Sequence, residues 1–239
     1  NAERGFRVLD ISLEMSVEQK WLRMACGDLG ISYDMVEANL IDSDARSEVI
    51  NRAAELGELY EDTIVIYEAP MTLTDILSAV KTEQPDVVWI DHSRLISGKP
   101  SDMTSYEWAM EIPTFLRQEV AKMKGGECAV NLLMQLNRSS SKENRRPNMH
   151  DLRLGGEDDP DMVTLLFRPE VDPNINYLPA GQVPIKFYTD KNRFGWTGET
   201  DIVFDLPYQK FLATEKFNPN KPTEKQIHYA INSAVGSED

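Results

Sequence analysis

The sequence predicts an α/β protein in which helices flank a mainly parallel sheet and antiparallel strands are added at one edge. From the N-terminus to about residue 135, short β-branched and apolar runs alternate with stretches of helical periodicity, as in strands joined by helical crossovers. Beyond that point short runs separated by turn residues remain, which is typical of hairpins. A hydrophobic content of 41% in 239 residues is sufficient for a sizeable core.

The parallel strands are expected where apolar and β-branched residues run together, at residues 6–12, 63–67, 86–90 and 129–134. Helices are expected between and around them, each opened by capping residues. They cover residues 17–28, 45–56, 72–81 and 104–124. Ser16 is the expected cap of the first helix and Ser43-Asp44 of the second. Pro113 predicts a kink or a break in the last.

The second half of the chain has a different character. Residues 137–150 form a polar loop longer than an ordinary connection, which indicates a functional or mobile segment. Further strands are expected at residues 162–167, 183–188 and 202–206, with a turn at 194–198.

We expect one domain over residues 1–212 and a polar tail over residues 213–239, where a capping box at Thr223 opens a short helix. The longest apolar runs are far below the roughly 20 residues of a membrane span, so no membrane partner is expected. Cys26 and Cys128 lie in apolar patterns, and three scattered histidines show no metal-ligand spacing. A reduced, cytoplasmic protein without structural zinc is the expectation.

The charge is uneven along the chain. A net charge of −15 argues against adhesion to nucleic acid over the whole surface. Between residues 136 and 153, however, basic side chains outnumber the two acidic ones. They are Arg138, Lys142, Arg145, Arg146 and Arg153. A basic loop on an acidic body indicates phosphate contact at one place, whereas the alternative is a solvated loop without a ligand.

Three expected strand ends each carry one functional polar residue: Glu14, Asp91 and Gln135. Ligands of open α/β sheets bind at the carboxyl ends of strands, so this set predicts a nucleotide-hydrolysing site. Asp91 has the position of an acid that holds Mg²⁺ beside phosphates, Glu14 of the group that polarises the attacking water, and Gln135 of a γ-phosphate sensor.

Each of these residues also has a structural explanation. An Asp after a buried strand often forms a turn or a cap. Glu14 could complement the dipole of the first helix, and Gln135 could satisfy backbone groups. The order and spacing of the motifs favour the functional interpretation.

The ordered motifs resemble those of the ATPase domain of DnaB-type hexameric replicative helicases. They are Ser12-Leu13-Glu14-Met15-Ser16, Asp91, Gln135-Leu136-Asn137-Arg138-Ser139, Arg146-Pro147 with Asp151-Leu152-Arg153, and Asp190-Lys191-Asn192-Arg193-Phe194-Gly195 with Thr197-Gly198. The resemblance covers roughly residues 5–211. Divergence within the motifs favours a phage-encoded or otherwise atypical member.

The resemblance implies a RecA-like fold that uses ATP and Mg²⁺ to translocate on single-stranded DNA and unwind duplex DNA as a hexameric ring, with 5′ to 3′ polarity. Glu14 would be the catalytic base, Asp91 the magnesium-binding acid and Gln135 the γ-phosphate sensor. Lys191 and Arg193 would reach the phosphates of the neighbouring subunit, with Arg193 as an arginine finger. A Lys-x-Arg in a hairpin is otherwise a solvated turn.

The family also implies a DNA-facing channel, a primase and a loader as partners, and a bacterial cell or a phage-infected host. The loop from Arg138 through Lys142, Arg145 and Arg146, together with the segment from Arg153 to Gly155-Gly156, matches the channel-facing parts. Backbone amides at the two glycines could bind phosphates without reading base sequence.

Two departures from the family matter. The G-x-x-x-x-G-K-[ST] phosphate loop is absent, and only Gly98-Lys99 comes close, so we expect this loop upstream of Asn1 and this segment alone to be inactive. Otherwise the chain is a non-catalytic RecA-like subunit that binds or regulates a helicase ring. His92 stands where the family more often has Tyr, a change that is also seen in related primase-helicases. Leu154 replaces an acidic residue.

Overall fold

The structure is a computed structural model, and it describes residues 1–136, 145–152, 158–169 and 181–213. The chain divides into two compact units. Unit 1 comprises Asn1–Pro160 and Leu206–Lys210, and unit 2 comprises Asp161–Asp205 and the segment that begins at Phe211.

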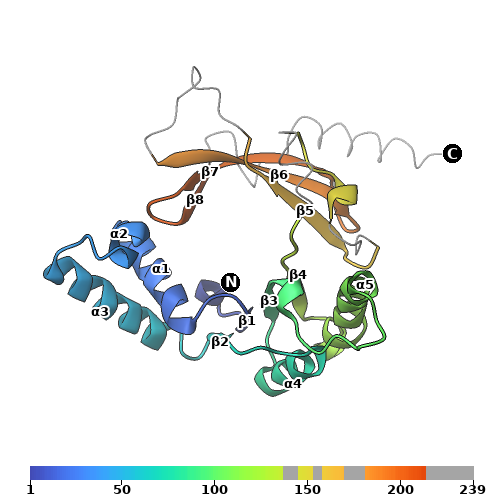
Figure 1. The fold of residues 1–239 in the computed structure, drawn as a ribbon. Coiled ribbons are helices and arrows are strands. Elements are labelled where there is room, and N and C mark those ends of the chain that lie inside the picture. Colours follow the sequence, from blue (N-terminus) through green and yellow to red (C-terminus); the bar gives the residue numbers. More distant parts are fainter. Residues whose placement is uncertain (137–144, 153–157, 170–180, 214–239) are drawn as a thin grey trace, which may run out of the picture. The chain divides into compact units, whose positions relative to one another are not determined.

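A four-stranded parallel sheet of order β2-β1-β3-β4 forms the centre of unit 1 (Figure 1). Its strands are β1 (Val8–Ser12), β2 (Ile64–Tyr67), β3 (Val87–Asp91) and β4 (Ala129–Leu132). In the register Ser12 lies opposite Asp91, and Ile90 lies opposite Leu132. The carboxyl ends of β1, β3 and β4 therefore lie at one edge of the sheet.

The helices of unit 1 begin at local capping signals. They are α1 (Val17–Leu29), α2 (Tyr33–Glu37), α3 (Ser43–Leu59), α4 (Leu73–Glu83) and α5 (Ser105–Phe115). Ser16, Thr72 and Thr104 each complete a capping box at the start of α1, α4 and α5. Asp42 caps α3 in place of the expected Ser43-Asp44 pair, so this helix begins earlier than the sequence indicated.

The long helix expected at residues 104–124 is divided. α5 contains Pro113 and passes into a π-helical turn at Leu116–Val120, where Ala121 N–H donates to the carbonyl of Leu116. A proline removes one main-chain donor, and a change of helical type is one way to accommodate it. Pro113 lies inside α5, so the kink or break expected there takes the form of a change of helical type at Leu116.

Two apolar clusters stabilise unit 1. In Figure 1, α4 and α5 lie on one side of the sheet and α1 and α3 on the other. Alternate residues of the central strands, among them Leu9, Ile11 and Ile90, are fully buried in the cluster that includes α4 and α5. The second cluster lies among α1, α2 and α3 and contains Cys26 and Val49.

Unit 2 is an antiparallel sheet of order β5-β6-β7-β8. Its strands are β5 (Met162–Phe167), β6 (Gln182–Asn192), β7 (Gly198–Asp205) and β8 (Lys210–Ala213). The β5–β6 register skips one residue, because Val163 pairs with Lys191 whereas Thr164 pairs with Thr189. β6 and β7 are longer than expected, and β8 was not expected. The predicted fold class, a mainly parallel sheet flanked by helices with added antiparallel strands, is confirmed. In the described residues the antiparallel strands form a sheet of their own, whereas they were expected at one edge of the parallel sheet.

Within the described ranges, no helix combines the length and the apolar character that crossing a membrane would require. The short helix expected after Thr223 lies outside the described residues.

Candidate strand-end site

Main-chain hydrogen bonds connect the carboxyl ends of β1, β3 and β4. Leu13 N–H donates to the carbonyl of Asp91 at 2.9 Å, and Leu133 N–H donates to the carbonyl of Ile90 at 3.0 Å. Ser93 N–H donates back to the carbonyl of Leu133 at 3.0 Å. These bonds extend past the ends of the strands, so the residues that follow are held at the edge where open α/β sheets bind ligands.

Glu14 lies in the turn between β1 and α1. The buried Ser12 donates its hydroxyl to the main-chain carbonyl of Met15 at 2.6 Å, and Ser16 caps α1 directly afterwards. The Glu14 side chain is 63% exposed. The turn therefore fixes the backbone while the carboxylate stays accessible to water.

His92 lies between the two carboxylates. It follows Asp91 through a cis peptide bond and is only 9% exposed. Its Nδ1 atom is 3.4 Å from Oε2 of Glu14 and 3.9 Å from Oδ1 of Asp91. The three side chains offer ligand atoms that all lie within 4.8 Å of one another.

This donor set fits the magnesium role expected for Asp91. Mg²⁺ is usually bound by one or two carboxylates while it keeps several waters and contacts substrate phosphates. Asp91 provides such oxygen atoms at the edge of the sheet. An imidazole nitrogen is not a preferred magnesium ligand, so His92 needs a different explanation.

Gln135 completes the group beyond the end of β4. Its Oε1 atom accepts a hydrogen bond from Nη1 of Arg94 at 3.0 Å, and its Nε2 atom lies 3.3 Å from Nε2 of His92. The structure thus brings Glu14, Asp91 and Gln135 together, as their positions after strands predicted. It adds Arg94, which no sequence pattern singled out, and His92, which stood out only as a departure from the family pattern.

The proposed finger residues belong to unit 2. Lys191 lies in β6 opposite Val163, and Arg193 follows the strand. Arg193 N–H donates to the carbonyl of Asp161 at 2.8 Å, and its Nη1 atom pairs with the Asp161 carboxylate at 2.9 Å. The side chains of this ion pair are 38% and 48% exposed. The role of Lys191 and Arg193 across a subunit interface stays a prediction.

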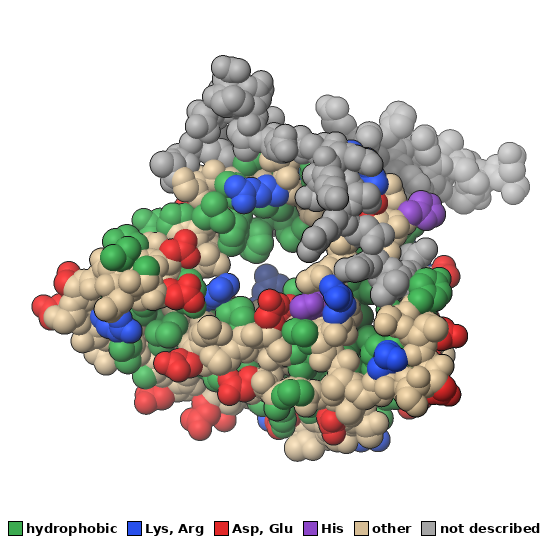
Figure 2. All heavy atoms as spheres, viewed as in Figure 1, with side chains coloured by type: hydrophobic (Ala, Val, Ile, Leu, Met, Phe, Trp, Pro, Cys, Tyr) green, Lys and Arg blue, Asp and Glu red, His purple; other side chains and the backbone are tan. Residues whose placement is uncertain are grey.

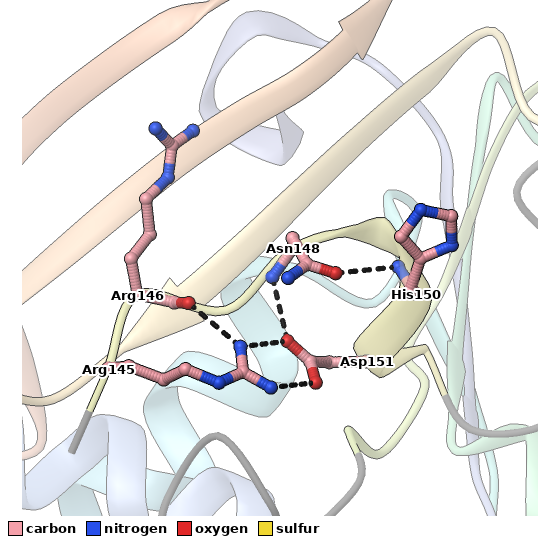
Figure 3. Close-up of polar contacts among 5 residues, drawn as sticks. All are labelled: Arg145, Arg146, Asn148, His150 and Asp151. Carbon is pink, nitrogen blue, oxygen red and sulfur yellow. Dashed lines mark hydrogen bonds and ion pairs between the residues drawn. The ribbon is translucent and has the colours of Figure 1, made fainter. Parts of the chain in front are cut away.

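Arg145 and Arg146 differ sharply in their surroundings. Both terminal nitrogens of Arg145 donate to the carboxylate of Asp151 at 2.7 Å, and Asp151 is only 4% exposed (Figure 3). Asn148 N–H donates to the same carboxylate at 2.9 Å. Arg146 joins this network through its main-chain carbonyl, while its exposed guanidinium points away from Asp151 (Figure 3).

Leu136 and Leu152, on either side of the segment that contains Arg145 and Arg146, form an antiparallel bridge. The remaining predicted DNA-binding residues, Arg138, Lys142, Arg153, Gly155 and Gly156, lie outside the described residues.

Lys99 is engaged in a turn rather than placed as a phosphate ligand. Its Nζ atom donates to the carbonyl of Met103 at 2.6 Å and to that of Pro100 at 3.2 Å. Gly98 has a φ of 85°, a conformation that favours glycine. Gly98 and Lys99 therefore belong to the turn that precedes α5.

Shallow depressions elsewhere on unit 1 fit a triphosphate poorly. One runs along α5 and is lined by Asp102, Glu107 and Glu111, among others. Another lies beside α3, with Asp44 and Glu48 in its wall. Figure 2 shows acidic side chains scattered over this unit with basic ones between them. Carboxylates in these walls would repel an anionic ligand, so the strand-end site remains the stronger candidate.

Comparisons with known proteins identify the family of the chain and similar folds. A family model described as the DnaB-like helicase C-terminal domain matches residues 1–213. A search of curated proteins found no match.

Solved structures share the fold. The ATPase domain of a phage helicase has a TM-score of 0.73 at 22% identity, over 90% of this chain and 76% of that one. A DnaB-like replicative helicase, studied together with its interactions with primase, gives 0.73 at 22% identity over 90% of this chain. The alignment covers 52% of that helicase, so the chain spans about half its length. A KaiC-like protein from Pyrococcus horikoshii gives 0.53 at 15% identity, over 89% of this chain and 77% of its own.

Proposed function

The chain belongs to the family of the DnaB-like helicase C-terminal domain, and we propose on this premise that it is the ATP-driven motor of a hexameric replicative helicase. In this role it couples ATP hydrolysis to movement along single-stranded DNA and to unwinding of the duplex. Residues 1–212 act as the motor domain in this proposal. The RecA-like fold implied by the sequence resemblance is confirmed by the structural matches.

The convergence of Glu14, Asp91 and Gln135 at one sheet edge is the observation that carries the proposal. Glu14 is exposed enough to contact a water molecule and to accept its proton as that water attacks the γ-phosphate. Asp91 supplies carboxylate oxygens for Mg²⁺, which when bound neutralises charge on the phosphate oxygens. The amide of Gln135 can donate to a γ-phosphate oxygen.

A second copy of this chain completes the site in the proposal. The Arg193 guanidinium offers a planar fork for the charge that spreads over the transferred phosphoryl group, and Lys191 adds a second positive charge. The ion pair of Arg193 with Asp161 is partly exposed, and such pairs stabilise by about 0 to 1 kcal/mol. Loss of this ion pair on binding a phosphate therefore costs little.

Single-stranded DNA is the proposed polymeric partner. Among the residues that the structure describes, Arg146 is the proposed DNA contact. Its guanidinium is exposed and directed away from the Asp151 network. Primase and a loader are proposed as further partners by analogy with the family.

The test is an ATPase assay of the complete protein, with and without single-stranded DNA. We expect DNA-stimulated phosphate release that the matched variant Glu14→Gln abolishes. Hydrolysis equal in both proteins would remove Glu14 from the base role. No hydrolysis in either protein, combined with binding to an active helicase ring, would instead support the non-catalytic subunit.

A further inference from the structure

We propose that His92 is a positioning residue that couples the candidate base Glu14 to the candidate sensor Gln135. The inference rests on the proposed function, since such coupling matters only if these two residues act on ATP. It assigns a role to a buried histidine that neither magnesium binding nor phosphate binding uses.

The contacts form one continuous chain of side chains. Arg94 donates to Oε1 of Gln135 at 3.0 Å, and the amide nitrogen of Gln135 lies 3.3 Å from Nε2 of His92. On the other side of the ring, Nδ1 of His92 lies 3.4 Å from Oε2 of Glu14. The histidine thus contacts the base with one ring nitrogen and the sensor with the other.

Arg94 sets the direction of this chain. A guanidinium only donates hydrogen bonds, so the oxygen of the Gln135 amide must face Arg94 and its NH₂ group must face His92. Nε2 of His92 then has to accept, and the single proton of the neutral ring lies on Nδ1. The Nδ1–H bond is the one that faces the carboxylate of Glu14.

The ring is well placed to transmit a change at Gln135. His92 is 9% exposed, and the next residue, Ser93, is hydrogen-bonded through its N–H to the carbonyl of Leu133. The two polar contacts of His92, with Gln135 at 3.3 Å and with Glu14 at 3.4 Å, are longer than the roughly 2.9 Å of a strong N–H···O bond. When the γ-phosphate draws the Gln135 amide, Nε2 loses its donor and the orientation of the ring toward Glu14 changes.

The first test measures the tautomer and needs no hydrolysis. The 239-residue chain contains three histidines, so histidine-selective nitrogen-15 labelling gives few ring signals, and His92→Gln assigns the one of interest. We expect the shift pattern of an Nδ1-protonated neutral ring. Gln135→Ala and Arg94→Ala should each move this pattern toward a mixture of tautomers, and both residues are exposed, so neither variant is expected to unfold the chain. An Nε2-protonated ring, or a pattern that both variants leave unchanged, would overturn the inference.

The second test measures turnover in the complete protein. His92→Ala should lower kcat for ATP by about 10- to 100-fold while KM stays within a few-fold, as for other residues that orient a catalytic group. His92→Gln keeps one donor and one acceptor and should recover much of this loss. Adding Gln135→Ala to His92→Ala should cost less than Gln135→Ala alone, because only the direct contact of Gln135 with the γ-phosphate is then left to lose.

The outcomes separate the two proposals. If the unchanged protein hydrolyses ATP and His92→Ala, shown to be folded by circular dichroism, keeps a normal kcat, the role of His92 is refuted and the motor assignment stands. If the unchanged protein hydrolyses nothing, the motor assignment fails, and the tautomer experiment alone decides whether the hydrogen-bonded chain exists.

Discussion

Replacing Arg145 and Arg146 one at a time should separate loop stability from DNA binding. Arg145 is bound through two hydrogen bonds to the buried carboxylate of Asp151, whereas the guanidinium of Arg146 points away from it. The two side chains are neighbours of identical chemistry, so each serves as the matched control for the other. We expect Arg145→Ala to loosen the loop and Arg146→Ala to weaken contact with phosphates.

The size of each effect follows from the contacts. Breaking a fully buried ion pair costs about 3 to 5 kcal/mol, but Arg145 is 36% exposed and Asp151 keeps the Asn148 N–H donor. The lower range for hydrogen bonds to a charged group, about 1.5 to 3 kcal/mol, therefore applies. A free-energy loss of about 1.4 kcal/mol corresponds to a tenfold change in an equilibrium constant. A loss of about 1.5 to 3 kcal/mol therefore predicts about 10- to 150-fold faster hydrogen exchange of the Asn148 amide in Arg145→Ala. Arg146→Ala should change that rate by no more than about twofold.

DNA affinity should respond in the opposite way. One phosphate contact to a single strand contributes about 0.7 to the slope of log K against log salt, which is about fivefold in affinity at 0.1 M salt. Arg146→Ala should lower the slope by about this amount for each subunit that contacts the strand. Arg146→Lys should keep the slope because the charge remains, whereas Arg145→Lys should not restore amide protection because lysine lacks the bidentate fork.

The assays are exchange monitored by mass spectrometry or NMR, and fluorescence anisotropy of labelled single-stranded DNA at several salt concentrations. Equal loss of DNA affinity in both alanine variants, with the Asn148 amide equally protected in each, would refute the distinction. An unchanged salt slope in Arg146→Ala would remove Arg146 from the interface.

Changes at the candidate site and at one helix cap give further expected outcomes. Glu14→Gln should lower ATP hydrolysis by at least about 100-fold while anisotropy shows unchanged DNA affinity, and retained turnover would contradict the base assignment. Arg193→Ala should lower hydrolysis by about 10³- to 10⁵-fold, and mixing it with Glu14→Gln subunits should restore part of the activity; no recovery would argue against action across an interface. Thr72→Ala should lower the free energy of unfolding by about 1 kcal/mol in urea titrations, because it removes the cap of α4. Hydrogen bonds from Thr72 lower the pKa of Asp75, so the contribution of Asp75 to stability is present above the ordinary carboxyl pKa and is lost as pH falls through the lowered value. Asp75→Asn should remove that acid-sensitive part of the stability curve, and identical pH profiles of the two proteins would contradict this.

The elements that the sequence predicted correctly depend on local signals. Ser16 and Thr72 stand directly before apolar periodicity with a partner three residues later, so α1 and α4 could be located without tertiary information. α2 contains only Tyr33–Glu37, too short for a period to be visible. Its position depends on the burial of Tyr33 and Val36 in the cluster formed with α1 and α3.

Other differences have long-range causes. Asp42, Ser43 and Asp44 are all good caps, and only the direction in which the chain arrives decides among them. β8 was missed because Lys210–Ala213 shows little alternation. Part of what positions it is the contact of Phe211 with Phe204, whose ring centroids are 4.7 Å apart.

The part of the candidate site that depends on sheet topology could be predicted from the sequence. Glu14, Asp91 and Gln135 each follow a strand, and a parallel sheet brings such positions to one edge. The link through His92 and Arg94 was not accessible, because it depends on side-chain hydrogen bonds between segments that are distant in the chain. Arg145 and Arg146 look alike in the sequence, and only the fold shows which one meets Asp151.

The residue skipped in the β5–β6 register makes the length of β6 critical. Side chains alternate between the two sides of a strand, and one extra residue reverses that alternation for everything after it. Lys191 and Arg193 follow the skipped residue, Asp190, so their side of the sheet depends on it. A deletion of Asp190 would move the side chains of Lys191 and Arg193 to the opposite side of the sheet. A deletion in the turn after Arg193 would leave them on their present side. In the proposed role of Lys191 and Arg193, a gap at Asp190 in an alignment of this family would therefore change function and would not be a neutral variation in length.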